Sequence, residues 1–204
     1  MRHLIPFTAI MALLGTPVLA DHPGERLDEI TAQKEPDFEA ISGPAPGLAL
    51  TGADGKPFDL AEFASQIVVV NVRASACLDP CQAQHDLLAQ TVASLNASPM
   101  REMVRFVTIA EEPTGIDTID AENWSVAAPD GSLADVAAQL ASRSARQEDT
   151  PMIHLLDREG RHVAIFHGSD FATLNLLMHI NGLTNAHPHP EPESFLERAI
   201  GWFE

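Results

Sequence analysis

The segment from residue 66 to residue 82 constrains the fold of this 204-residue chain more than any other part of it. It begins with an uninterrupted run of mainly β-branched residues (QIVVVNVR), which is typical of a strand buried on both faces of a sheet. A short loop then leads to Cys77 and Cys81, and apolar residues recur at helical spacing between Pro80 and Leu95. The pattern predicts a strand, a loop and a helix, with the only two cysteines of the chain where the helix begins.

The segments around this unit predict more strands and helices. An Asp-Gly turn within residues 48–60 indicates a β-hairpin. Helices are expected at residues 132–142 and 171–180, the second ending at Asn181-Gly182, a pair that favours a C-cap. Further strands are expected at residues 104–110, 152–156 and 162–167. This order mixes a crossover connection with antiparallel pairs, so we predict an α/β fold with a central mixed β-sheet flanked by helices.

The N-terminal residues have the composition of an export signal. Residues 1–20 carry one early cation, an apolar stretch and small residues before the expected cleavage point after Ala20. We therefore expect an exported protein of the periplasm, with a retained membrane anchor as the alternative. In the mature chain no apolar run is long enough to span a membrane.

Composition divides the mature chain into three parts. Residues 21–46 are acidic and contain several prolines, so we expect a leader with at most one short helix near residues 29–40. Residues 47–184 are expected to form the folded domain. Residues 185–204 are expected to form a tail that contains His187 and His189 beside prolines and to end in a short amphipathic helix.

The formal net charge of −17 bears on possible partners. Such an acidic surface argues against binding to nucleic acid and to anionic membranes. It suits cationic partners and metal ions, although acidity by itself mainly favours solubility.

The position of the cysteines at a helix start predicts unequal chemistry for them. Asp79 is expected as the N-cap, Pro80 as the first helical residue and Gln82 as the closing member of a capping box. Free N–H groups at that end favour an anion and so lower the cost of a thiolate on Cys77. Cys81 would lie within the first turn as a shielded resolving thiol. A purely structural disulfide is the alternative, but closing so small a loop removes little chain entropy.

Two charged positions flank this cysteine loop. Arg73 could stabilise a thiolate, or it pairs with a nearby acid as an ordinary surface cation. Glu111 and Glu112 follow a buried strand at its C-terminal end, where ligands gather in open sheets, or they are solvated loop charges.

Residues 45–80 resemble the front of the TlpA and peroxiredoxin-related (AhpC/TSA-like) branch of thioredoxin-fold proteins. The resemblance is carried by Asp54-Gly55-Lys56, by the VVVNV strand and by Ala74-Ser75-x-Cys77. Thr150-Pro151 resembles the cis-proline of that family, which lies against the cysteine pair. The resemblance implies a thioredoxin-like fold and catalytic roles for Cys77, Cys81 and Pro151.

The cysteine spacing points to a different branch. Cys77-x-Asp79-x-Cys81 is similar to the motif of the SCO (SenC/PrrC) family, which delivers copper to cytochrome oxidase and holds the metal with two cysteines and a distant histidine. The corresponding histidine position falls at about Asp149 here. His154 in the following strand and His85 one helical turn after Cys81 are the candidates for a third copper ligand. His187 and His189 are weaker candidates.

Three functions are compatible with these residues. The first is a periplasmic SCO-like metallochaperone that binds copper through Cys77 and Cys81 and serves cytochrome oxidase or another cuproprotein. The second is a TlpA-like thiol–disulfide oxidoreductase with a periplasmic thiol or disulfide partner and no cofactor. The third is a non-catalytic interaction domain with a structural disulfide. A peroxidase is disfavoured because Ala74 stands where that class has Thr or Ser.

Overall fold

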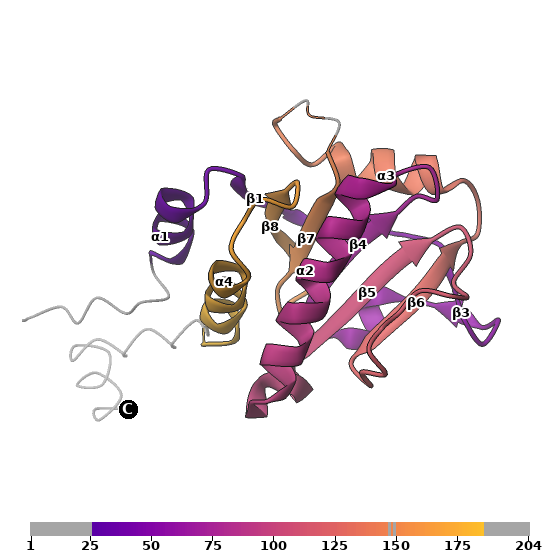
Figure 1. Ribbon diagram of the computed structural model, residues 1–204, viewed down its shortest axis with the longest axis horizontal. Coiled ribbons are helices and arrows are strands. Elements are labelled where there is room, and N and C mark those ends of the chain that lie inside the picture. The colour runs from indigo at the N-terminus through magenta and orange to yellow at the C-terminus, as the bar shows by residue number, and fades with distance from the viewer. Residues whose placement is uncertain (1–25, 147, 149, 186–204) are drawn as a thin grey trace, which may run out of the picture.

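The computed structural model describes residues 26–185 except 147 and 149, and its centre is an eight-stranded mixed sheet (Figure 1). The spatial order of the strands is β1-β8-β7-β4-β5-β6-β2-β3. Strands β4, β5 and β6 run parallel to one another, and the other neighbours pair antiparallel. The predicted α/β fold with a mixed central sheet is confirmed.

The elements have the following bounds. The strands are β1 Phe38–Pro44, β2 Leu50–Gly52, β3 Pro57–Phe58, β4 Ile67–Arg73, β5 Val104–Ala110, β6 Trp124–Pro129, β7 Met152–Leu156 and β8 Arg161–His167. The helices are α1 Leu27–Lys34, α2 Asp79–Asn96, α3 Leu133–Ala141 and α4 Thr173–Asn185. Two short 3₁₀ helices, η1 Leu60–Phe63 and η2 Pro99–Met103, connect them.

The sheet has a hydrophobic core on each face. Successive side chains of a strand point to opposite faces, so Ile67 and Val69 of β4 pack under α2 and α4, whereas Val68 and Val70 pack under α3. This two-sided burial explains the continuous β-branched run of β4. From the C-terminal end of β4 the chain passes through the cysteine loop into the N-terminal end of α2.

The folded domain begins earlier than residue 47. Helix α1 contacts α4, and β1 extends the sheet by pairing antiparallel with β8, with Phe38 opposite Phe166 (Figure 1). Both elements lie in the segment expected to be a leader, so that boundary was placed too late. The error has a physical reason: β1 ends in Ser-Gly-Pro, which are turn-forming residues, and its ladder is irregular between Ala40 and Gly43.

Strand β6 and the end of helix α4 also differ from the expected elements. Strand β6 was not anticipated, because only Trp124 and Ala127 of its six residues are fully buried and no alternation is visible. Helix α4 continues through Gly182 to Asn185 rather than stopping at a C-cap. The expected signal at residues 1–20 and the tail after residue 185 lie outside the described residues. Within 26–185, no helix is long and apolar enough to cross a membrane.

Candidate functional site

Cys77 and Cys81 form a disulfide at the start of α2. Their Sγ atoms are 1.97 Å apart and their Cα atoms 5.6 Å apart. The two residues differ in exposure: Cys81 is 6% exposed within the first helical turn, whereas Cys77 is half-buried in the loop before the helix. The neighbouring Leu78 is 73% exposed, although it is apolar. A partner can therefore approach the disulfide from the side of Cys77.

The helix start differs from the expected capping box. Leu78 is the N-cap residue, no side chain caps the helix, and Asp79 is already helical. The side chain of Gln82 is engaged elsewhere, since it accepts a hydrogen bond from Nη2 of Arg73 and donates one to Asp86, each at 2.7 Å. The absence of a side-chain cap leaves the first N–H groups of α2 to act on the cysteine loop, which supports a thiolate there.

Hydrogen bonds on two sides hold the cysteine loop. The hydroxyl of Ser75 donates to Oε2 of Glu111 at 2.5 Å, so the C-terminal end of β5 anchors the loop two residues before Cys77. The backbone N–H of Cys77 donates to the carbonyl of Ala74 at 3.1 Å. Glu111, which the sequence left as either a ligand or a solvated charge, therefore anchors the loop. Arg73, which was expected either to stabilise a thiolate or to pair with an acid, donates its hydrogen bond to Gln82. Sequence reasoning missed the role of Ser75.

Pro151 lies at the same end of the sheet as the cysteine loop. Strand β7 pairs antiparallel with β4, with Ile153 opposite Asn71, so the residues before β7 reach the end where β4 passes into the loop. The Thr150–Pro151 bond is not cis, since the described residues contain no cis peptide bond. The expected cis-proline was therefore wrong in its geometry, and the bond has the trans form that X–Pro bonds ordinarily prefer.

His154 is not brought to the cysteines. Its neighbours Ile153 and Leu155 face α2, so alternation along β7 turns His154 to the opposite face of the sheet. There it is buried, and its Nδ1 lies 3.1 Å from Nε2 of His162. Burial, and secondarily the charge of His162, lowers the pKa of His154 to about 3. The structure therefore excludes His154 as a ligand shared with Cys77 and Cys81.

His85 lies on the same helix face as Cys81. It is buried one turn further along α2, and its ring packs against that of Trp124 with centroids 5.1 Å apart. Its Nδ1 is buried without a hydrogen-bond partner. Burial lowers the pKa of His85 and so favours the neutral imidazole. A neutral ring with a vacant nitrogen is able to accept a proton or a metal ion.

A buried polar chain lies beneath α2. Nε1 of Trp124 donates to Oγ1 of Thr108 at 3.0 Å, and that hydroxyl donates to Oδ1 of Asn71 at 2.8 Å. The chain links β6, β5 and β4 below the ring of His85, whose Nδ1 has no hydrogen-bond partner. It fixes the Trp124 ring and, through it, the position of His85.

The structure bears directly on the expected copper site. Among the described residues, no group of three His, Cys, Asp or Glu side chains is arranged to hold a metal ion. Both sulfurs are bonded to each other, so they become metal donors only after reduction. Asp149, His187 and His189 lie outside the described residues.

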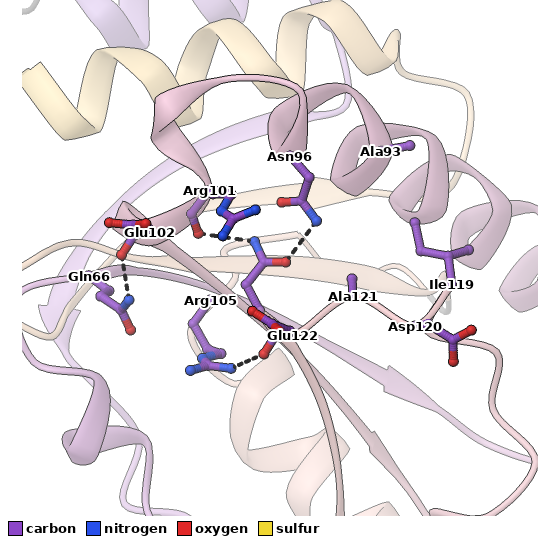
Figure 2. Close-up of a pocket in the computed structure, with 11 residues that line it drawn as sticks. Gln66, Ala93, Asn96, Arg101, Glu102, Arg105, Ile119, Asp120, Ala121 and Glu122 are labelled. Carbon is purple, nitrogen blue, oxygen red and sulfur yellow. Dashed lines mark hydrogen bonds between the residues drawn. The ribbon is translucent and has the colours of Figure 1, made fainter.

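A polar pocket of about 660 Å³ is lined by residues of several elements (Figure 2), and neither Cys77 nor Cys81 is among them. Its lining includes Gln66 before β4, Asn96 at the end of α2 and Arg105 at the start of β5. These are the ends of the elements opposite to those that carry Cys77 and Cys81. Nη1 of Arg105 donates to the carbonyl of Glu122 (Figure 2), and Nδ2 of Asn96 donates to Oδ1 of Asn123, whereas Nε of Arg105 and Oδ1 of Asn96 are buried without a hydrogen-bond partner. The lining contains no cysteine or histidine. We therefore take the disulfide, and not this pocket, as the candidate site.

Comparison with known proteins identifies the fold. No family model matches the chain, and no curated protein sequence matches it. Among solved structures, BsSco, a member of the Sco family of cytochrome c oxidase assembly proteins, matches with a TM-score of 0.57 at 10% identity over 73% of this chain and 98% of its own. A SCO1/SenC family lipoprotein from Bacillus anthracis matches with 0.55 at 15% identity over 71% and 97%.

Oxidoreductase-like structures are equally similar. A putative protein disulfide isomerase from Bacteroides thetaiotaomicron matches with a TM-score of 0.55 at 20% identity, over 71% of this chain and 90% of its own. At such identities these likenesses show a thioredoxin-like fold shared with SCO/SenC proteins and with thiol–disulfide oxidoreductases. They do not choose between the two activities.

Proposed function

We propose that the chain is an SCO-like thioredoxin-fold protein whose Cys77–Cys81 disulfide exchanges with thiols of a partner protein. The observation that carries this proposal is the unequal exposure of the two sulfurs at the start of α2. A partner thiolate attacks Sγ of Cys77, the Cys77–Cys81 bond breaks, and Cys81 leaves as a thiolate. A second partner thiolate then attacks the partner sulfur of the mixed disulfide, and Cys77 leaves as a thiolate, so the protein gains two electrons and the partner becomes a disulfide. The reverse sequence reduces a partner.

A structural role for the bond explains less. A loop closed by cysteines four residues apart contributes only about 2 kcal/mol by the chain-entropy estimate. The helix α2 is already held by its buried face, which includes Leu88, Val92 and Leu95. A structural bond also gives no reason for the exposed Leu78 beside the half-buried sulfur.

The reduction potential tests the proposal. We expect oxidised protein, equilibrated with dithiothreitol or glutathione buffers, to be reduced reversibly with a potential above about −300 mV. Structural disulfides of secreted proteins lie below that value. A bond that resists reduction in the native state would contradict the exchange function and support the third function, a structural disulfide.

Copper delivery is the second candidate function, and one observation favours it. The vacant, buried Nδ1 of His85 lies one turn after Cys81, and two thiolates with an imidazole suit Cu(I). Copper would be a cargo taken up by the reduced protein, with a cytochrome oxidase subunit or another cuproprotein of the periplasm as its recipient. His154 takes no part in this site.

Competition for Cu(I) with a chelator separates the two functions. If copper is a cargo, reduced wild-type protein retains Cu(I), and His85→Phe weakens binding about tenfold, which corresponds to about 1.4 kcal/mol. His154→Asn serves as the matched control and should bind as the wild type does. Loss of copper from wild-type protein to the chelator, together with normal disulfide exchange, would leave exchange as the function.

A further inference from the structure

The side-chain amide of Gln84 is buried in α2, three residues after Cys81. Its exposed fraction is only 1%, and the amide is flanked along the helix by apolar residues such as Leu87 and Leu88. A buried amide is unfavourable unless it is hydrogen-bonded, and an apolar side chain could fill the position instead. Its Nε2 donates to the carbonyl of Gly168 at 2.8 Å. The polar residue therefore has a specific partner outside its own helix.

Gly168 continues this connection to the segment before β7. It follows the last residue of β8 and has φ of +69°, a conformation that glycine adopts without steric strain. Its N–H donates to the carbonyl of Pro151 at 2.7 Å while its carbonyl accepts from Gln84. A hydrogen-bonded path therefore runs from the cysteine helix through Gly168 to Pro151.

The path ends at the end of the sheet where β4 passes into the cysteine loop. Thr150 is exposed and Pro151 half-buried, and both precede β7 at the end of the sheet that carries the cysteine loop. An attacking sulfur must approach Cys77 in line with the disulfide bond. A displacement of about 1 Å in such a geometry slows a reaction by up to two orders of magnitude.

We infer that Gln84 is a positioning residue for thiol–disulfide exchange, which holds the Thr150–Pro151 segment at a fixed distance from Cys77 so that a bound polypeptide presents its sulfur in line. This inference rests on the proposed exchange function. A polypeptide that carries the attacking sulfur extends beyond Cys77 and can reach the exposed Thr150. A small thiol does not extend to the segment and does not need it.

The test compares a peptide with a small thiol. The rate of attack on the oxidised protein is measured with a twelve-residue peptide containing one cysteine and with dithiothreitol. Gln84→Met keeps the side-chain length but removes the donor, and it should slow the peptide at least fivefold while leaving the dithiothreitol rate within twofold. Thr91→Val is the matched control, because the buried Thr91 hydroxyl bonds only to the carbonyl of Leu87 within α2. Both of its rates should equal those of the wild type.

The other outcomes overturn the inference in distinguishable ways. Equal slowing of peptide and dithiothreitol would mean that Gln84 only stabilises the fold, and unchanged rates would mean that it positions nothing. In both cases the exchange function stands, because the wild-type protein reacts. Failure of wild-type protein to react with either thiol would overturn the exchange function and this inference together. If Gln84→Met does not fold, Gln84→Asn, whose shorter amide cannot reach Gly168, replaces it with the same expectations.

Discussion

The side chain of Leu27 in α1 fills the space beside Gly182 in α4. A β-carbon at position 182 would lie 2.7 Å from Cδ2 and 3.1 Å from Cγ of Leu27. Because Cγ is also crowded, rotation of the terminal methyl groups alone does not relieve the contact. Gly182 therefore serves close packing between two helices, which is why α4 passes through it instead of ending there.

This packing predicts the effect of Gly182→Ala. Alanine favours a helix over glycine by about 1 kcal/mol, but overpacking costs about 1–3 kcal/mol, so we expect a net destabilisation of about 1 kcal/mol in urea unfolding. In a Leu27→Ala background the same change should become stabilising. If Gly182→Ala stabilises both proteins equally, α1 does not pack on α4 as described.

The bond between Ser75 and Glu111 predicts an energetic coupling across the cysteine loop. Ser75→Ala and Glu111→Ala should each lower the free energy of unfolding of the oxidised protein, and the double variant should lose less than the sum. We expect a coupling of about 0.5–1 kcal/mol, since the bond is charge-assisted but exposed. Additive losses in the double-mutant cycle would show that Glu111 does not hold the loop.

The buried histidines predict a loss of stability in mild acid. Burial lowers the pKa of His154 to about 3 and that of His162 to about 4, from 6.5 in the unfolded chain. Between pH 6.5 and pH 4 the unfolded state therefore binds more protons, so stability falls as the pH falls through this range. At pH 5 the loss should be on the order of 1–2 kcal/mol for each histidine.

The variant His154→Asn isolates this effect. Its side-chain nitrogen can replace the imidazole Nδ1 as a partner of His162, but it does not titrate. Urea midpoints measured from pH 7 to pH 5 should fall less steeply for the variant than for the wild type. Identical slopes would mean that His154 is not buried in its neutral form.

Much of the fold and the unequal cysteines could be predicted from local patterns. The β-branched run of β4, the helical spacing of α2 and the position of Cys81 within its first turn depend on residues that are close in sequence. Burial on two faces produces the first pattern and burial of one helix face the second. Both patterns are therefore visible without knowledge of the tertiary structure.

The position of His154 away from the cysteines could not be predicted, because it depends on which face of the sheet each strand residue occupies. His154 was slightly favoured over His85 because the resemblance to SCO-like folds brings its strand past the cysteines. Side chains alternate between the two faces of a strand, so either Ile153 and Leu155 or His154 could have faced the cysteine helix. The packing of Ile153 and Leu155 under α2 shows that His154 lies on the opposite face of the sheet. Gln84 was missed for a similar reason, since its partner Gly168 is 84 residues away in the sequence.

Export stays a prediction from residues 1–20. We expect periplasmic material to have an intact mass that begins at Asp21, because the signal pattern places cleavage after Ala20. A mass that includes residues 1–20 would indicate a retained anchor.

The most direct test of the exchange function is to trap the mixed disulfide with a partner thiol. Cys81→Ser leaves the half-buried Cys77 without its resolving partner, whereas Cys77→Ser leaves only Cys81, a residue that is 6% exposed. Incubation of each variant with a disulfide-containing peptide, followed by acid quenching and mass spectrometry, should show a stable adduct of Cys81→Ser. Cys77→Ser should form adduct at least tenfold more slowly. Equal adduct formation by the two variants, or faster formation by Cys77→Ser, would contradict the assignment of Cys77 as the reacting sulfur.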